Sequence, residues 1–233
     1  MTEAADRFAR GEIGPWTTII ARHQVKGRGR RNRRWEAAAG DALLATVVAP
    51  VNIPPERIGL ISLAAGLAIA DAISEWMVPV SLKWPNDIYL DERKLGGVLI
   101  HTRLDATITA MVGIGVNLGS VPEGQMSSAI CMAEILAETP SPRELAESIV
   151  RWLRARFGQL DEGRWRETVD DWTARALWIE ESVSVQSRMP VDGRLAGVDE
   201  FGRMLIETAG HVEAMSEGDV RRGPRPSLYL DID

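Results

Sequence analysis

The densest group of reactive side chains lies between Lys26 and Arg34, where six cations occur without an acidic residue. The whole chain has a formal net charge of -6, so this positive charge is local. Arginines this close repel one another and do not pack into a core, which predicts a loop that binds a polyanion. A guanidinium group offers planar, paired donors to phosphate and carboxylate oxygens. Gly27 and Gly29 let a ligand approach the backbone.

This arginine-rich loop could also serve a dinucleotide site or a nucleic-acid site. The spacing Gly27-x-Gly29-x-x-Asn32 approaches the dinucleotide-binding fingerprint, but Asn32 replaces the third glycine and no helix is predicted directly afterwards. An arginine- and glycine-rich arm could bind RNA or DNA. A sequence pI near 5.3 argues against a general nucleic-acid-binding protein, which is usually basic. The pattern therefore favours a small anionic ligand, with nucleic-acid binding kept as the alternative.

Composition indicates a globular protein, with 45% hydrophobic and 26% charged residues among 233. Cys131 is the only cysteine, which excludes an intramolecular disulfide and a cysteine-based zinc site. The histidines form no helix-face pair, so no metal site is predicted. Residues 1–10 are too polar for a signal peptide, and residues 58–73 are too short and mixed for a membrane span. These features predict a soluble, cytoplasmic protein without a membrane partner.

The element pattern predicts an α+β protein with a mixed, largely antiparallel sheet and flanking helices. Helices are expected over residues 2–10, with Thr2 as N-cap, and over 56–76, 130–138, 141–157 and 164–175. Ser141 and Glu144 form a capping box that opens the fourth of these helices. Strands are expected over residues 17–21, 42–49, 80–90 with a turn at 85–87, 94–102 and 106–117. After Trp178, four short strands with a turn at residues 199–202 predict a small β-barrel.

A second reactive group is the sequence Lys83-Trp84-Pro85-Asn86-Asp87. Lys83 lies in an otherwise apolar strand, so its side chain should reach a cleft or solvent. The alternative is a lysine on an edge strand, where its charge discourages aggregation.

Taken together, four motifs resemble those of the biotin protein ligases. They occur in the family's order as GRGRRNRRW, KWPNDI, KLGGVLI and GIGVN. The resemblance implies a class II synthetase-like catalytic domain over residues 1–176, an SH3-like β-barrel over 177–222 and a tail over 223–233. It also implies the short form of the family, without a DNA-binding N-terminal domain, and leaves monomer and homodimer open.

The activity implied by the resemblance is a two-step, ATP-dependent ligation. The carboxylate of biotin attacks the α-phosphate of ATP to give biotinyl-5'-AMP, and a lysine of a biotin carboxyl carrier protein then takes the biotin. Mg²⁺ accompanies ATP. The implied catalytic residues are Lys83 and Arg30. The implied biotin-binding residues are Gln24, Gly27, Arg28, Gly29, Arg30, Lys83, Gly113 and Gly115. The implied ATP-binding residues are Arg28, Arg30, Arg31, Arg33, Trp35, Lys83 and Asn117.

Departures from the family pattern are expected to matter most at the start of the chain. The family has a Ser-Thr pair that contacts biotin just before the first helix, and this pair would precede Met1, which predicts weaker biotin binding or a different start. Asn32 replaces a glycine, and Lys26 replaces a small residue. The alternatives within this fold are a degenerate homologue that binds biotin or adenylate without efficient ligation, and a relative that acts on lipoyl or octanoyl groups. Residues 26–35 are expected to be mobile and to become ordered on ligand binding.

Overall fold

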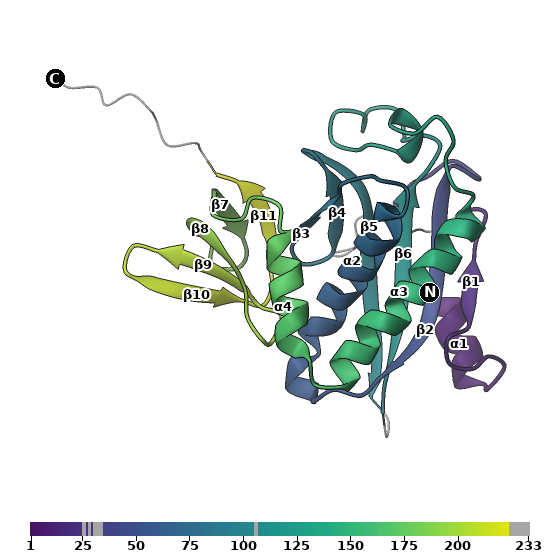
Figure 1. The fold of residues 1–233 in the computed structure, drawn as a ribbon, viewed down its shortest axis with the longest axis horizontal. Helices are drawn as coiled ribbons and strands as arrows, with labels where there is room; N and C mark the ends of the chain where they lie inside the picture. The colour runs from purple at the N-terminus through teal and green to yellow at the C-terminus, as the bar shows by residue number, and fades with distance from the viewer. Residues whose placement is uncertain (25–26, 28, 30–34, 105–106, 224–233) are drawn as a thin grey trace.

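The computed structural model describes residues 1–24, 27, 29, 35–104 and 107–223. Its largest element is a six-stranded antiparallel sheet with the strand order β1-β2-β6-β5-β4-β3 (Figure 1). The strands are β1 (Thr18–Ile20), β2 (Ala42–Val51), β3 (Ser81–Lys83), β4 (Asp87–Leu90), β5 (Arg93–Leu104) and β6 (Ile108–Asn117). We call this the catalytic sheet, after the catalytic domain that the sequence resemblance implies over residues 1–176. Nearly every residue of β2 is buried, as its continuous apolar run predicted.

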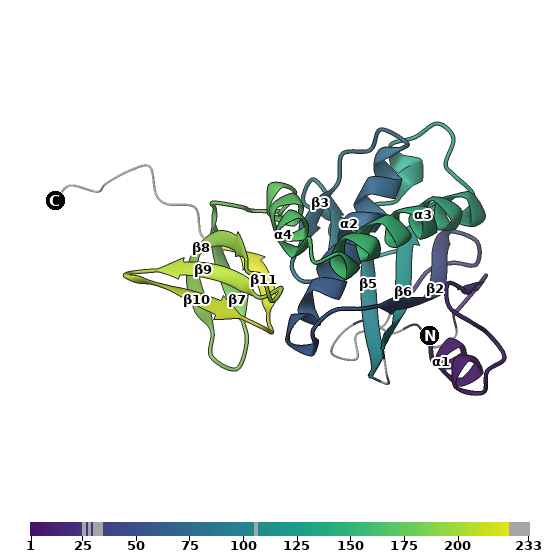
Figure 2. The same ribbon diagram turned by 60° about the horizontal axis from the view of Figure 1, so that its bottom comes forward.

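Helices cover one face of the catalytic sheet, and α1 lies at its other face (Figures 1 and 2). The covering helices are α2 (Gly59–Ser74), which follows the 3-10 turn η2 (Pro55–Arg57), α3 (Pro142–Asp161) and α4 (Trp165–Ala174); α1 spans Thr2–Ala9. Residues 60–73 of α2 are buried except Ser62, so this helix is a core element. Met1, rather than Thr2, occupies the N-cap of α1.

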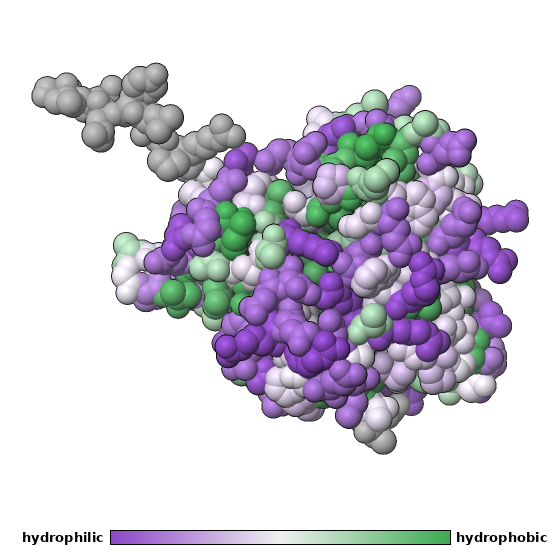
Figure 3. Space-filling view, in the orientation of Figure 1, coloured by the Kyte–Doolittle hydropathy of each residue, from purple (hydrophilic) through white to green (hydrophobic). Residues whose placement is uncertain are grey.

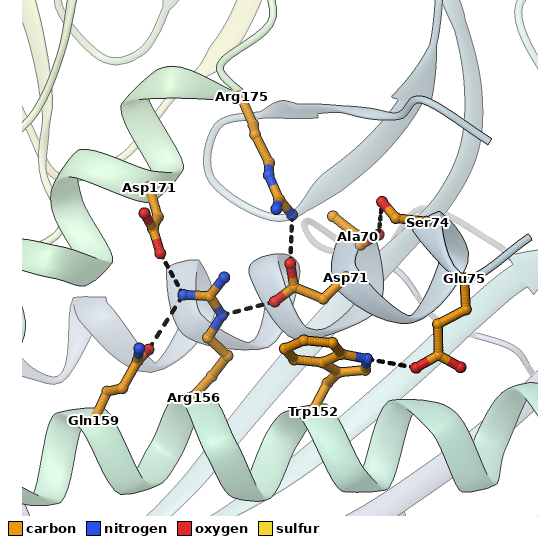
Figure 4. A network of polar contacts seen from close by, with 9 residues as sticks. All are labelled: Ala70, Asp71, Ser74, Glu75, Trp152, Arg156, Gln159, Asp171 and Arg175. Carbon is orange, nitrogen blue, oxygen red and sulfur yellow. Dashed lines mark hydrogen bonds and ion pairs between the residues drawn. The ribbon is translucent and has the colours of Figure 1, made fainter. Parts of the chain in front are cut away.

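A buried ion-pair network joins the three covering helices (Figure 4). Asp71 of α2 contacts the guanidinium groups of Arg156 on α3 and of Arg175, each at 2.7 Å. Arg156 also pairs with Asp171 of α4 at 2.5 Å. Asp71 and Arg156 are both buried, so each charge depends on its partners. The network therefore fixes α2, α3 and α4 relative to one another.

The capping box at the start of α3 is confirmed, whereas the helix predicted over residues 130–138 is wrong. Ser141 accepts a hydrogen bond from the Glu144 amide at 3.2 Å, and the Ser141 amide donates to Glu144 at 2.9 Å. The preceding segment forms only the 3-10 turn η3 (Met132–Glu134). The start of the segment is extended instead: the Ile130 amide donates to the carbonyl of Lys94 at 3.0 Å, and Cys131 has a φ of -121° and a ψ of 162°. The helical turn therefore begins only at Met132, and it ends at Ile135, whose φ of -120° is not helical.

A second antiparallel sheet follows α4, with the order β10-β9-β8-β7-β11. Its strands are β7 (Ser182–Gln186), β8 (Val191–Val198), β9 (Met204–Thr208), β10 (His211–Met215) and β11 (Asp219–Arg222). We call this the C-terminal sheet. The prediction of a small β-unit is confirmed, but its closure into a barrel is wrong, because β10 and β11 are the two edges of the sheet within the described residues. The strand β11, which pairs with β7, was not predicted.

Polar residues cover most of the face shown in Figure 3, and apolar residues form separate patches. Among the described residues, no helix combines the length and apolar character needed to cross a membrane.

Candidate active site

Three of the sequence motifs meet in one row of paired residues across the catalytic sheet. In the strand order β3-β4-β5-β6-β2, this row consists of Lys83, Asp87, Gly97, Gly115 and Leu44. Residues paired across antiparallel strands project from the same face of a sheet. Motifs that are distant in sequence are therefore neighbours on one surface.

A second row lies beside the first and consists, in the order β5-β6-β2-β1, of Leu99, Gly113, Thr46 and Ile19. The two rows, apart from Lys83, form the floor of a cavity of about 760 Å³. Residues 1–4 at the start of α1 line the cavity as well. A cavity of this size is typical of small-molecule sites. Gly97, Gly113 and Gly115 have no side chains, so the floor is open at these three positions.

Trp35 lies directly over Gly115. A β-carbon at Gly115 would be 2.8 Å from the indole ring, which is too close for any other residue. The indole nitrogen of Trp35 is buried and has no hydrogen-bond partner among the described residues. The amide of Trp35 donates to the Gly27 carbonyl at 3.1 Å. An acceptor on a bound ligand would satisfy this buried donor.

Lys94 is the lysine that lines the described part of the cavity wall. Its ammonium is 2.6 Å from Oδ1 of Asp87, and both residues line the cavity. The ammonium is also 5.7 Å from the centroid of a Trp35 ring. The carboxylate of Asp87 thus holds the ammonium at the end of the floor next to Trp35.

The backbone around Lys94 is fixed from both sides. Its amide donates to Ser128 at 2.9 Å and its carbonyl accepts from Ile130 at 3.0 Å. The neighbouring Arg93 donates to Glu134 at 2.7 Å, and this hydrogen bond lowers the pKa of the Glu134 carboxyl. The loop after β6 therefore supports the position of Lys94.

Comparison with known proteins identifies the family. Residues 6–118 match the model of the biotin/lipoate A/B protein ligase family. A biotin–[acetyl-CoA-carboxylase] ligase of Mycobacterium tuberculosis is 33% identical over 230 residues, which cover 93% of this chain and 84% of that protein. The chain belongs to the biotin protein ligase family.

Further relatives agree with this membership. The ligase of Paracoccus denitrificans that bears the same name is 30% identical over 203 residues, covering 81% of this chain and 82% of that one. The solved structure of the Aquifex aeolicus biotin protein ligase in complex with biotin and ATP aligns with a TM-score of 0.82 at 28% identity, covering 94% of each chain. The predicted family and α+β fold are thereby confirmed.

The structure brings several of the predicted site residues of this ligase-family chain to the cavity. Those that line it are Gln24, Gly29, Trp35, Gly113 and Gly115. Gly27 lies against Gln24, since a β-carbon at Gly27 would be 3.0 Å from the Gln24 side-chain oxygen. Arg28, Arg30, Arg31 and Arg33 lie outside the described residues, as do Lys26 and Asn32. Their roles, and the predicted ordering of residues 26–35, stay predictions.

Two predicted residues lie elsewhere. Asn117 is buried, and its amide donates to the Ile130 carbonyl at 3.0 Å, so its side chain braces the loop that supports Lys94. Lys83 is not among the described residues that line the cavity. Its ammonium lies 4.0 Å from Asp219 and 3.5 Å from the Tyr89 hydroxyl. The predicted adenine contact of Asn117 and catalytic role of Lys83 stay predictions, and Lys94 is a further lysine at the described cavity wall.

Sequence reasoning missed several cavity residues. Lys94 and Asp87 belong to motifs that were recognised, but they were not assigned to the site. Gly218 and Asp219 reach the cavity from the C-terminal sheet, and Gln125 reaches it from the loop after β6. The sequence could have indicated Lys94 and Gly97. The short turn between β4 and β5 predicts a hairpin, and pairing in that hairpin places both residues near the turn at residues 85–87. Nothing local in the sequence indicates the contributions of Gln125 or Asp219.

Proposed function

We propose that this protein is an ATP-dependent biotin protein ligase, which forms biotinyl-5'-AMP and transfers biotin to a lysine of a biotin carboxyl carrier protein. The observation that carries the proposal is the glycine-floored cavity with Lys94, Asp87 and Trp35 at one end, in a chain whose relatives bear this activity in their names. The Aquifex aeolicus relative, whose structure contains biotin and ATP, supports the same pair of substrates.

The first step brings two anions together. A carboxylate oxygen of biotin attacks the α-phosphorus of ATP, and the bond to the β-phosphate bridge breaks to release pyrophosphate. Negative charge builds on the phosphate oxygens, so a fixed cation stabilises the transition state. The predicted catalytic residues Lys83 and Arg30 would supply this charge, and Lys94, whose ammonium pairs with Asp87 at the cavity wall, supports a further contribution. The predicted contacts of Arg28 and Arg30 would add further positive charge.

The cavity floor suits a flat apolar ligand next to a charged one. Gly113 and Gly115 leave room for biotin, and Gln24 offers an amide at the cavity edge. Trp35 would cover the adenylate and exclude water, which protects a mixed anhydride from hydrolysis. In the second step a neutral lysine amine of the carrier attacks the biotinyl carbonyl carbon, AMP leaves, and the amine loses its proton.

Mg²⁺ would enter with ATP. Asp87 and Asp219 are the carboxylates near the proposed phosphate position, and oxygen ligands suit this ion. No cluster of three or more metal-binding side chains occurs among the described residues. The residues present therefore fit an ion held mainly by phosphates and water with one or two carboxylates. A cytoplasmic location and the division of the chain at residues 176 and 177 belong to this proposal as predictions.

The test mixes the purified full-length chain with biotin and MgATP and measures biotinyl-AMP by mass spectrometry and pyrophosphate release. A carrier domain added afterwards should gain biotin on its lysine. Lys94→Met should slow adenylate formation by about 100-fold or more, as the loss of a transition-state donor does. Arg143→Met on α3, where the side chain is 84% exposed, is the control that removes a cation away from the cavity.

Absence of adenylate with the unaltered protein would overturn the ligase proposal. Biotin binding without adenylate would instead indicate the degenerate homologue. Salt-sensitive oligonucleotide binding would favour the nucleic-acid alternative.

A further inference from the structure

Trp84 connects the cavity to the C-terminal sheet. It is buried, with 4% of its surface exposed, and its side chain lines the cavity. Its indole nitrogen donates to the Gly202 carbonyl at 3.1 Å, in the turn between β8 and β9. In the sequence Trp84 stands between Lys83, the predicted catalytic residue, and the turn at residues 85–87. A displacement of this indole would therefore move the segment that carries both.

The turn at residues 85–87 is also held by two other elements. The hydroxyl of Ser62 on α2 donates to the Pro85 carbonyl at 3.0 Å. On β5, the Val98 amide donates to the Asn86 carbonyl at 2.8 Å, and the side-chain amide of Asn86 donates to the Val98 carbonyl. The indole hydrogen bond is thus a third support, and it comes from the C-terminal sheet. Because the Val98 amide is bonded to the turn, its hydrogen exchange reports movement of the turn.

The turn that accepts the indole hydrogen bond has a fixed shape. Oδ1 of Asp199 accepts from the amides of Phe201 at 3.0 Å and Arg203 at 2.9 Å. Oδ2 accepts from the Arg203 side chain at 2.7 Å, and the Gly202 amide donates to the Asp199 carbonyl at 2.9 Å. Aspartate often fixes a turn through such bonds to the backbone. The Gly202 carbonyl therefore has a defined direction toward the indole.

Arg57 anchors this turn to the helices. Its guanidinium lies 3.9 Å from the centroid of a Trp165 ring on α4 and 5.0 Å from that of Phe201. It also donates to the carbonyl of Glu200 at 2.7 Å and to its carboxylate at 2.9 Å. The Arg57 side chain is only 14% exposed, which strengthens such ring contacts. Figures 1 and 2 show the C-terminal sheet beside α4 and the start of α2.

We propose that Trp84 is a positioning residue, through which the turn at residues 199–202 holds the segment from Lys83 to Asp87 in place at the cavity. Its indole N–H is bonded to Gly202, so this group acts through the turn rather than on a ligand. Lys83 keeps its predicted catalytic role, and the Asp87–Lys94 pair follows directly after the supported turn. The effect on catalysis rests on the proposed function, whereas the coupling between the two turns does not.

The test uses Trp84→Phe, which removes the indole N–H and keeps an aromatic ring. It leaves the carbonyl of the buried Gly202 without this donor. Exchange of the Val98 amide, followed by NMR, should become about tenfold faster. The kcat/KM for ATP in adenylate formation should fall about tenfold, mainly because KM rises. Unchanged exchange in β2 and β6 shows that the variant is folded.

Trp152→Phe on α3 is the matched control. It makes the same change at an indole that donates to Glu75 at 2.8 Å, away from the described cavity lining. Val98 exchange and kcat/KM should both stay at the values of the unaltered protein.

A double-mutant cycle with Arg57→Met separates positioning from direct contact, because Arg57 is not among the described residues that line the cavity. Arg57→Met loosens the turn at residues 199–202 and should change Val98 exchange and KM in the same direction as Trp84→Phe. The double variant should show less than the sum of the two effects, since the turn acts on the cavity through the bond already removed. Arg57→Met combined with Trp152→Phe should be additive.

Three results would overturn the proposal. Unaltered Val98 exchange and kinetics in Trp84→Phe would leave the indole N–H without a positioning effect. A fall in kcat of about 100-fold with unaltered Val98 exchange would mean that Trp84 acts on the reacting atoms. Full additivity of Trp84→Phe and Arg57→Met would mean that the two turns are not coupled. If the unaltered protein forms no adenylate, the ligase proposal fails, and the same cycle measured by Val98 exchange still decides the role of Trp84.

Discussion

At the scale of single residues, the missing side chain at Gly115 determines how closely Trp35 approaches the cavity floor. A methyl group there would lie 2.8 Å from the indole ring, so either the ring or β6 would have to move. The strand cannot move easily, because Gly115 pairs with Gly97 on one side and Leu44 on the other. The ring would therefore be displaced into the cavity or away from the floor.

Gly115→Ala should accordingly weaken ligand binding more than folding. We expect the dissociation constants of biotin and ATP, measured by calorimetry, to rise by about tenfold or more, while the free energy of unfolding falls by about 1–3 kcal/mol from overpacking. Gly158→Ala is the control, since a β-carbon at this helical position meets no atom within 4 Å. It should add stability of about 0.5–1 kcal/mol without affecting binding. Equal ligand affinity in both variants would contradict this account of Gly115.

Residue types and their spacing predicted part of the cavity lining. The rest could not be predicted, because the sequence does not show which way a side chain points. A local motif was enough to predict Gln24, Gly29 and Trp35, because all three belong to the arginine- and glycine-rich stretch that indicated an anion site. Lys83 and Lys94 are harder to distinguish, since both stand in strands next to the turn at residues 85–87. The Lys83 ammonium lies near Trp178 and Asp219, which are more distant in sequence than any local pattern extends.

At the scale of elements, the ion pairs among α2, α3 and α4 require the desolvation of buried charges and hold the three helices in one specific geometry. Arg156 is buried with Asp71, and Figure 4 shows Arg175 approaching the same carboxylate from another direction. Desolvation of these charges is compensated only while every partner is present. The helices that cover the catalytic sheet are thus held by charges that tolerate little displacement.

Arg156→Met should destabilise the fold by about 3 kcal/mol, because Asp71 would keep its charge with one partner fewer. Arg143→Met on the same helix is the matched control, since it removes an exposed arginine that pairs with Glu147 in the i,i+4 arrangement. This control should change the free energy of unfolding by about 0.5 kcal/mol or less. Urea unfolding followed by circular dichroism gives both values. A loss below about 1 kcal/mol for Arg156→Met would show that Arg175 alone compensates Asp71.

Elements with strong periodicity were predicted well, and those decided by tertiary hydrogen bonds were not. The apolar period of α2 and the capping box of α3 are local features, and both elements formed as expected. The helix predicted over residues 130–138 fails because Ile130 bonds to Lys94 of β5 and Cys131 is extended, so that only a 3-10 turn forms from Met132. The strand β11 was missed because its pairing with β7 joins segments more than 30 residues apart.

At the scale of the whole molecule, the C-terminal sheet meets the rest of the fold at glycines. A β-carbon at Gly59, the first residue of α2, would be 2.4 Å from the Phe201 carbonyl, and one at Gly202 would be 2.6 Å from the backbone of Gly59. Gly202 also has a φ of 78°, which favours glycine. Arg57 strengthens this contact, because its guanidinium donates to the Glu200 carbonyl at 2.7 Å. The turn between β8 and β9 is therefore seated directly on the start of α2.

Gly59→Ala should separate the C-terminal sheet from α2 at this point without disrupting either one. The clash is with backbone, which cannot rotate away as a side chain can, so we expect a loss of about 1–3 kcal/mol in the free energy of unfolding. Because the same turn accepts the hydrogen bond of Trp84, KM for ATP should rise as well. Gly66→Ala is the control within α2, where a β-carbon would lie 3.7 Å from Leu82, an ordinary contact. It should be neutral or stabilising, since alanine favours a helix. Similar thermal unfolding of the two variants would mean that the turn between β8 and β9 adjusts at little cost, and that the seating of the C-terminal sheet does not depend on Gly59.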